Sequence, residues 1–277
     1  MTATDQTIRR RTEHPDLSLF PNLLYLGPQR TGSTWLHANL SRHPQVNMHR
    51  DKETFYFSTL GRPDAPRFRY EFLEDYLDSF RDSLARRAFK HYHALRRCGM
   101  FYHPCVRGDF TASYCVLDDA VIAQIMSLQP GMRGIILVRD PLERAWSHAK
   151  KDLVRGRSQP AGAREMLEFI SSPDQLERAD YRGIITRWRR HLAPGNLFVA
   201  PYSGISFNPV ELLDAISGFL DIRCLGGASK RHVTTRQNVT PAAAISPSLK
   251  EEARAVLASA GVSCRELLDE IGPGRIY

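Results

Sequence analysis

Short apolar runs alternate with longer amphipathic segments along this chain. Residues 22–26, 134–138 and 196–200 are mainly apolar, and the run at 134–138 is continuous and rich in β-branched side chains. Such runs are typical of strands buried on both faces of a parallel sheet. Helical patterns or helix signals are found at residues 33–42, near 68–89, at 118–129, behind Pro141, at 209–220 and at 248–260. This alternation predicts an α/β fold with a central, mainly parallel β-sheet flanked by helices.

The chain of 277 residues is long enough to bury a sizeable core, and it shows no repeat at a fixed period. We expect a flexible N-terminal arm over residues 1–20 and a single domain over residues 21–277. No stretch approaches the roughly 20 apolar residues that cross a bilayer, and the N-terminus lacks the apolar core of a signal peptide. No membrane span is therefore expected, and a cytoplasmic location is predicted.

The charge of the chain favours anionic ligands. Lysine and arginine outnumber aspartate and glutamate by 38 to 30, giving a formal net charge of +8. Nucleic acid is not the expected partner, because the basic residues form no aromatic-basic stripe and no recognisable binding motif. The five cysteines include no C-x-x-C pair, and the ten histidines show no ligand spacing, so neither a disulfide framework nor a metal site is expected. The sequence gives no indication of the oligomeric state.

The first apolar run leads into a turn that is suited to an anion. In Gly27-Pro28-Gln29-Arg30-Thr31-Gly32-Ser33-Thr34, two glycines bracket the cation of Arg30 and the hydroxyl of Thr31, and two further hydroxyls, of Ser33 and Thr34, follow at the start of a predicted helix. Glycines allow tight turns and close approach, and the first N–H groups of a helix point toward an anion. The spacing fits the start of the nucleotide-binding pattern G-x-x-x-x-G-K-[ST], but Ser33 stands where the lysine belongs. An ordinary nucleoside triphosphate site is therefore not expected.

A second candidate follows the run at 134–138. Arg139 comes directly after this strand, and Ser147 lies about two turns into the helix that Pro141 opens. Both side chains are expected to face the crevice at the carboxyl ends of the parallel strands, where open α/β sheets bind their ligands.

Together, the segment from Gly27 to Trp35 and the segment from Arg139 to Ser147 resemble the two cofactor motifs of sulfotransferases that use 3′-phosphoadenosine 5′-phosphosulfate (PAPS). The resemblance implies that the first loop holds the 5′-phosphosulfate, through Arg30, Thr31, Gly32, Ser33 and Thr34. It also implies that Trp35 contacts the adenine and that Arg139 and Ser147 hold the 3′-phosphate. The fold that it implies is the P-loop-like sulfotransferase fold, in which a strand, a loop and a helix bind the donor.

Further segments resemble the heparan-sulfate-type branch of this family. Lys52-Glu53-x-x-x-Phe57 is similar to a segment whose glutamate deprotonates the acceptor hydroxyl, so Glu53 is the candidate base. Arg30 and Lys52 would stabilise the charge that develops on the transferring group. If Glu53 were not the base, the role would pass to His49, His91, His93 or His103. Asp109 lies in a segment similar to one near the acceptor, and Lys230 and Arg231 stand where relatives place a basic loop over the cofactor.

The sequence therefore predicts a sulfotransferase that moves the sulfuryl group of PAPS to an acceptor hydroxyl by in-line displacement, leaving adenosine 3′,5′-bisphosphate (PAP). No metal is required in this scheme. The acceptor could be a glycan, a lipid, a phenol or another natural product, and a peptide tyrosine is an alternative. A P-loop kinase or NTPase is a second function class, and the missing lysine argues against it. A basic binding module for nucleic acid or another anionic partner is the third function class.

Overall fold

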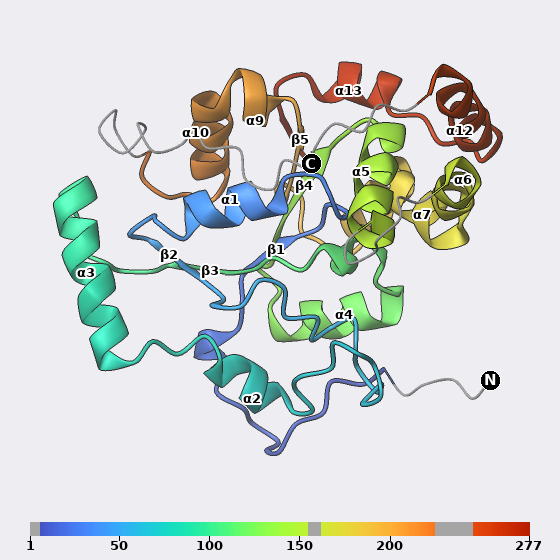
Figure 1. Ribbon diagram of the computed structural model, residues 1–277. Helices are drawn as coiled ribbons and strands as arrows, with labels where there is room; N and C mark the ends of the chain where they lie inside the picture. Colours follow the sequence, from blue (N-terminus) through green and yellow to red (C-terminus); the bar gives the residue numbers. More distant parts are fainter. Residues whose placement is uncertain (1–5, 155–161, 225–245) are drawn as a thin grey trace.

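The computed structural model describes residues 6–154, 162–224 and 246–277, which form an α/β domain around a six-stranded sheet (Figure 1). The strands lie in the order β2-β3-β1-β4-β5-β6. The first five run parallel, and β6 pairs antiparallel with β5. Their bounds are β1 Leu23–Tyr25, β2 Val46–Met48, β3 Val106–Asp109, β4 Arg133–Val138, β5 Leu197–Pro201 and β6 Arg275–Ile276. The predicted fold class is confirmed.

Successive side chains of the central strands enter two different cores, because a strand turns alternate residues to opposite faces. Ile136 and Val138 of β4 lie in one core, while Ile135 and Leu137 lie in the other. All four are at most 1% exposed. A strand buried on both faces explains why this run is apolar at every position and does not alternate.

Helices cover both faces of the sheet (Figure 1). One core is closed by α1 (Ser33–Leu40), α9 (Gly204–Phe207) and α10 (Pro209–Phe219). The other is closed by α2 (Leu73–Asp78), α4 (Asp119–Leu128), α8 (Tyr181–Arg189) and α13 (Arg265–Ile271). A smaller cluster joins α5 (Pro141–Val154), α6 (Ala163–Ser171), α7 (Pro173–Ala179) and α12 (Pro247–Ser259). None of the helices in the described part of the chain has the length and apolar character needed to cross a bilayer.

The helix expected near residues 68–89 was predicted wrongly. The chain instead forms α2 and, after a break, α3 (Leu84–Cys98). The new helix begins at Ser83, whose side chain accepts a hydrogen bond from the backbone N–H of Arg86. Ser83 is thus an N-cap within what looked like one helical run. The short strands β2 and β3 and the helices α6, α7 and α8 were not predicted.

Residues 6–20 of the expected N-terminal arm lie against the domain. Ile8 and Phe20 are 5% and 1% exposed and belong to the larger core, and Arg9 forms a single bridge with Phe72 before α2. These buried apolar side chains attach the described part of the arm to the fold, whereas the sequence led us to expect a loose segment.

Because β1 to β5 are parallel, their carboxyl ends meet at one edge of the sheet. The loops that follow β1, β2, β3 and β4 therefore come together there, and they contain most of the residues singled out in the sequence. β1 lies between β3 and β4, so the chain order changes direction beside it. Such a position is where open α/β sheets bind ligands.

Candidate active site

The loop between β1 and α1 has the conformation of an anion-binding turn. Gly32 precedes α1 with a φ of 93°, and Arg30 also has a positive φ of 72°. This φ is one that residues with a side chain rarely adopt, and a Cβ at Gly32 would lie 2.3 Å from Cδ1 of Ile205, so glycine is strongly favoured there. Gly32 offers no side chain to cap α1, and the first N–H groups of this helix can therefore meet an anion.

The two motifs predicted to bind the donor meet in one place. Nε of Arg30 donates to Oγ of Ser147 at 2.9 Å, and Nη1 of Arg139 donates to the backbone carbonyl of Arg30 at 3.0 Å. The guanidinium of Arg139 also lies over the ring of Tyr202, 4.7 Å from its centroid. Residues 109 and 117 positions apart are thus joined at the carboxyl ends of β1 and β4.

This part of the site concentrates positive charge. The pKa of Arg30 is lowered by burial and then by the charge of Arg139. The pKa of Lys150, on α5, is lowered in the same way by burial, Arg139 and Arg30. Mutual repulsion between cations is relieved when an anion enters. Sequence reasoning missed Lys150, although it lies three residues after Ser147 and so shares its helix face.

Two of the residues predicted to bind the sulfuryl donor have buried side chains. Thr31 is fully buried, and its hydroxyl donates to the carbonyl of Pro28 at 2.6 Å and contacts the hydroxyl of Tyr25 at 2.7 Å. Its side chain therefore shapes the loop. Trp35 is 4% exposed and packs in the core beneath α1 with Leu36. The indole of Trp35 is thus a core side chain, and its predicted contact with the adenine stays a prediction.

Of the other residues predicted to bind the sulfuryl donor, two lie at the start of α1 and two lie outside the described residues. Ser33 is buried at the start of α1, and Thr34 next to it faces an open cleft. Lys230 and Arg231 lie outside the described residues, so their contact with the cofactor remains a prediction.

The cleft beside Thr34 contains the candidate base. It has a volume of about 550 Å³ and is lined by Thr34, Lys52, Glu53, Phe55, Pro66, Arg67, Phe68, Arg69 and Lys151. Oε1 of Glu53 lies 3.6 Å from Nζ of Lys52, and its Oε2 lies 3.7 Å from Nη1 of Arg67. The backbone N–H of Ala112 donates to Oε1 at 3.4 Å. Glu53 is thus an oriented carboxylate at the wall of a cleft that reaches the first turn of α1 at Thr34.

Lys52 is held in a partly dry environment. Burial lowers the pKa of its ammonium, and the nearby Glu53 carboxylate opposes that shift. The dielectric constant around this ammonium is lower than in water. The ammonium therefore interacts more strongly with a developing negative charge than it would in water.

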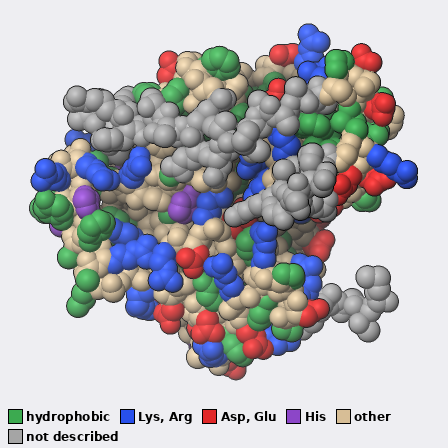
Figure 2. Space-filling model, viewed as in Figure 1, with side chains coloured by type: hydrophobic (Ala, Val, Ile, Leu, Met, Phe, Trp, Pro, Cys, Tyr) green, Lys and Arg blue, Asp and Glu red, His purple; other side chains and the backbone are tan. Residues whose placement is uncertain are grey.

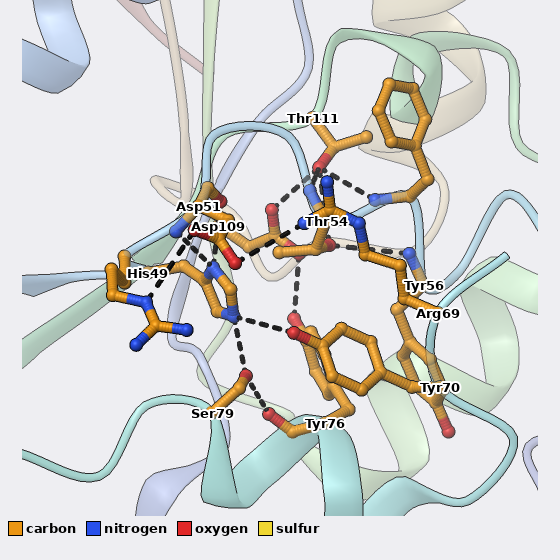
Figure 3. A network of polar contacts seen from close by, with 12 residues as sticks. His49, Asp51, Thr54, Tyr56, Arg69, Tyr70, Tyr76, Ser79, Asp109 and Thr111 are labelled. Carbon is orange, nitrogen blue, oxygen red and sulfur yellow. Dashed lines mark hydrogen bonds and ion pairs between the residues drawn. The ribbon is translucent and has the colours of Figure 1, made fainter. Parts of the chain in front are cut away.

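Asp109 is the centre of a buried network of hydrogen bonds that includes Thr54, the residue after Glu53 (Figure 3). Its Oδ2 accepts hydrogen bonds from the hydroxyls of Thr54, Tyr76 and Tyr114 at 2.6 to 2.8 Å, and its Oδ1 accepts one from Thr111 at 2.8 Å. The carboxylate is fully buried. Since Thr54 follows Glu53 directly, Asp109 fixes the backbone that presents the candidate base. It is a positioning residue and does not line the cleft.

The alternative bases lie elsewhere. His49 is buried beside this network, with Nε2 2.5 Å from Oγ of Ser79 and Nδ1 accepting from the N–H of Asp51 (Figure 3). His91 and His93 belong to α3, and His103 precedes β3. None of the four lines the cleft that Glu53 lines. In the described segments, no group of three or more His, Cys, Asp or Glu side chains is arranged to hold a metal ion.

A buried histidine next to Ser147 predicts a pH dependence of stability. His148 packs edge-on against Phe169, its Nδ1 lies 3.3 Å from Oε1 of Gln175, and its Nε2 lies 3.2 Å from Asp152. Burial lowers its pKa to about 4, although Asp152 acts in the opposite direction. Between pH 6.5 and about 4 the unfolded chain therefore binds a proton that the folded chain does not, and stability is lost as the pH falls.

We expect His148→Leu to reduce this acid sensitivity. The melting temperature, measured at pH 7.5 and pH 5, should fall less between the two conditions in His148→Leu than in the wild type. His14→Gln, at an exposed histidine, is the control and should keep the wild-type difference. Equal falls in the wild type and in His148→Leu would show that His148 does not titrate in this window.

Comparison with known proteins identifies the arrangement. The profile described as "Sulfotransferase family" matches residues 21–225. A sulfotransferase from Alicyclobacillus acidocaldarius superposes with a TM-score of 0.63 at 20% sequence identity, over 90% of this chain and 96% of that chain. Sulfotransferase STF9 from Mycobacterium avium gives a TM-score of 0.50 at 15% identity, over 91% of this chain and 76% of that chain. A search of curated protein sequences gave no match. At these identities the two structures support the fold, and the profile match supports the family.

Proposed function

The chain belongs to the sulfotransferase family, and from this premise we propose that it transfers the sulfuryl group of PAPS to the hydroxyl of an acceptor. The observation that carries the proposal is the contact between Arg30 and Ser147, which joins the loop after β1 to the helix after β4. With Arg139 bonded to the same loop, it brings two separate cationic motifs into one site. A ligand with two phosphate-containing ends, such as PAPS, fits such a pair of motifs.

The residues of the donor side fit this ligand. The N-terminus of α1, with Gly32, Ser33 and Thr34, would hold the 5′-phosphosulfate together with Arg30. Arg139 and Ser147 would hold the 3′-phosphate, since a guanidinium provides several donors in a plane that matches phosphate oxygens. Lys150 adds charge on the same helix face as Ser147.

When bound, PAPS supplies the sulfuryl group: a new S–O bond to the acceptor oxygen forms as the S–O bond to the 5′-phosphate breaks, which leaves PAP. The protein contributes positioning, charge and a proton acceptor. Glu53 accepts the proton of the acceptor hydroxyl from the wall of the cleft. Lys52 and Arg30 stabilise the negative charge that develops, from a site that is partly screened from water. Asp109 keeps the Glu53 segment in place through Thr54.

Calorimetry with PAP, using ATP as the comparison ligand, tests the donor assignment. We expect PAP to bind without added metal and ATP to bind much more weakly, because the loop lacks the lysine that reaches the β- and γ-phosphates. Tight binding of ATP without binding of PAP would contradict the proposal and would favour a kinase or NTPase.

Arg139→Ala should weaken PAP binding by about 10- to 100-fold, since a charge-assisted hydrogen bond contributes about 1.5 to 3 kcal/mol. Arg133→Ala is a matched control, because Arg133 stands at the opposite end of β4 and donates to the carbonyl of Phe219. Its affinity for PAP should equal that of the wild type. Equal affinities of all three proteins would remove Arg139 from the donor site.

A further inference from the structure

The cleft that contains Glu53 carries more positive charge than the transfer reaction requires. Its lining includes four cationic side chains and one carboxylate. Glu53 lies within 3.7 Å of two of these cations, Lys52 and Arg67, and can neutralise only one charge. The charge of Lys151 also acts on Lys52 and lowers its pKa, after the larger effect of burial. Lysine and arginine side chains are spread across the face of the molecule shown in Figure 2.

Two of these cations, Arg67 and Arg69, are separate from the residues proposed for the donor and for the transfer step. Arg30, Arg139 and Ser147 do not line the cleft, which reaches the first turn of α1 at Thr34. Arg67 and Arg69 come from the segment between residues 61 and 72, on a different part of the chain from β1, β4 and α5. The cleft is therefore a second cationic site next to the first.

Arg67 is oriented by two contacts within the cleft. Its guanidinium lies over the ring of Phe55, 4.4 Å from the centroid, while Nη1 approaches Glu53. Phe55 has a φ of 59°, which is unfavourable for a bulky side chain and is tolerated where the surrounding structure requires it. The result is a flat guanidinium supported by an aromatic ring, with its side chain 61% exposed. A guanidinium in this setting can bind an oxyanion through two parallel hydrogen bonds.

Arg69 also lines the cleft, and its ion pair with Asp51 neutralises its charge only in part. Its Nη1 lies 3.4 Å from Oδ2 of Asp51, which does not line the cleft and also lies 3.7 Å from Arg50 (Figure 3). One carboxylate is thus shared between two guanidinium groups. Such exposed pairs are weak, so a ligand oxyanion can compete for Arg69.

We propose that the acceptor is a small hydroxyl compound that also carries an oxyanion group, such as a carboxylate or a phosphate. Arg67 and Arg69 bind the oxyanion while the hydroxyl meets Glu53. The cleft volume of about 550 Å³ lies within the range of small-molecule sites. This inference rests on the proposed function, because it names the substrate class of the same site.

The test compares neutral and anionic ligands that share a scaffold. Glucose, glucuronate and glucose 6-phosphate form one set, and 4-hydroxyphenylacetamide and 4-hydroxyphenylacetate form another. Binding of each compound to the enzyme saturated with PAP is measured by calorimetry in the wild type, Arg67→Gln, Arg69→Gln and Arg81→Gln. Arg81 is the control, because it is an exposed arginine that pairs with Asp78 and does not line the cleft.

In at least one set we expect a charged member to bind about tenfold tighter than its neutral counterpart, as one charge-assisted contact would give. Arg67→Gln and Arg69→Gln should each remove most of this preference, whereas Arg81→Gln should keep it. The charged member that is preferred distinguishes carboxylate from phosphate. Absence of any preference for charge, including absence of binding by every compound, would overturn the inference.

Failure of the inference is distinguishable from failure of the proposed function. If PAP binds and the charged compounds have no advantage, the acceptor inference is wrong and the donor assignment stands. If PAP itself does not bind, the proposed function fails, and this inference fails with it.

Discussion

Glu53→Gln is expected to lower kcat by about 10²- to 10⁴-fold, the contribution that a positioned general base typically makes. Glutamine keeps the size of the side chain and its carbonyl oxygen but cannot take the acceptor proton. PAP affinity should stay unchanged, because Glu53 lies in the cleft proposed for the acceptor while Arg30, Arg139 and Ser147 form the proposed donor site. Turnover is measured as PAP release with a saturating acceptor, and PAP binding is measured by calorimetry.

Glu71→Gln is the control for this substitution. Glu71 is an exposed glutamate that pairs with Arg9, away from the cleft, so its kcat should equal that of the wild type. If Glu53→Gln kept wild-type turnover, the proton would have to pass to another group. The histidines considered above lie outside the cleft lining, so the acceptor would then have to bind in a different place.

Asp109→Ala is expected to lower the free energy of unfolding by about 3 to 5 kcal/mol, among the largest effects of a single substitution. The change leaves the hydroxyls of Thr54, Thr111, Tyr76 and Tyr114 without their shared acceptor in a fully buried place. Urea unfolding followed by circular dichroism measures the loss.

Two further variants are controls for the loss of stability in Asp109→Ala. Asp109→Asn keeps the size of the side chain and one acceptor oxygen, so its loss should be smaller than that of Asp109→Ala. Asp78→Ala removes an aspartate that is 67% exposed and should change stability by no more than about 0.5 kcal/mol. A loss below about 1 kcal/mol in Asp109→Ala would show that the hydroxyls find other partners and that Asp109 does not anchor the Glu53 segment.

The sequence predicted the parts of the fold in which local pattern and burial agree. β4 and the start of α5 at Pro141 were readable because a strand buried on both faces is apolar throughout and proline suits the first position of a helix. The single helix expected near residues 68–89 was wrong, because the cap at Ser83 begins a new helix within an apparently continuous pattern. The short strands β2 and β3 were missed, since their sequences Val-Asn-Met and Val-Arg-Gly-Asp include polar residues and form no apolar run, unlike that of β1.

The candidate site divides in the same way. The glycine-bracketed loop and the spacing of Arg139 and Ser147 were visible because each motif is local. Arg67, Arg69, Lys150 and Lys151 were not singled out, because an isolated cation in a sequence has the same appearance whether it faces solvent or a cleft. Thr31 and Trp35 stand inside the first motif, yet their side chains point into the loop and the core.

The sequence by itself determined the class of the fold and the two cationic motifs, one of which is the glycine-bracketed loop, since strand burial and helix starts depend on residues that are close together in the chain. Only the tertiary structure decided which side chains meet. The parallel sheet brings the carboxyl ends of β1 to β4 to one edge, and this joins Arg30 to Ser147 and Thr54, the residue after Glu53, to Asp109. Contacts across a hundred residues depend on sheet order and on the packing of both cores, which no local pattern encodes.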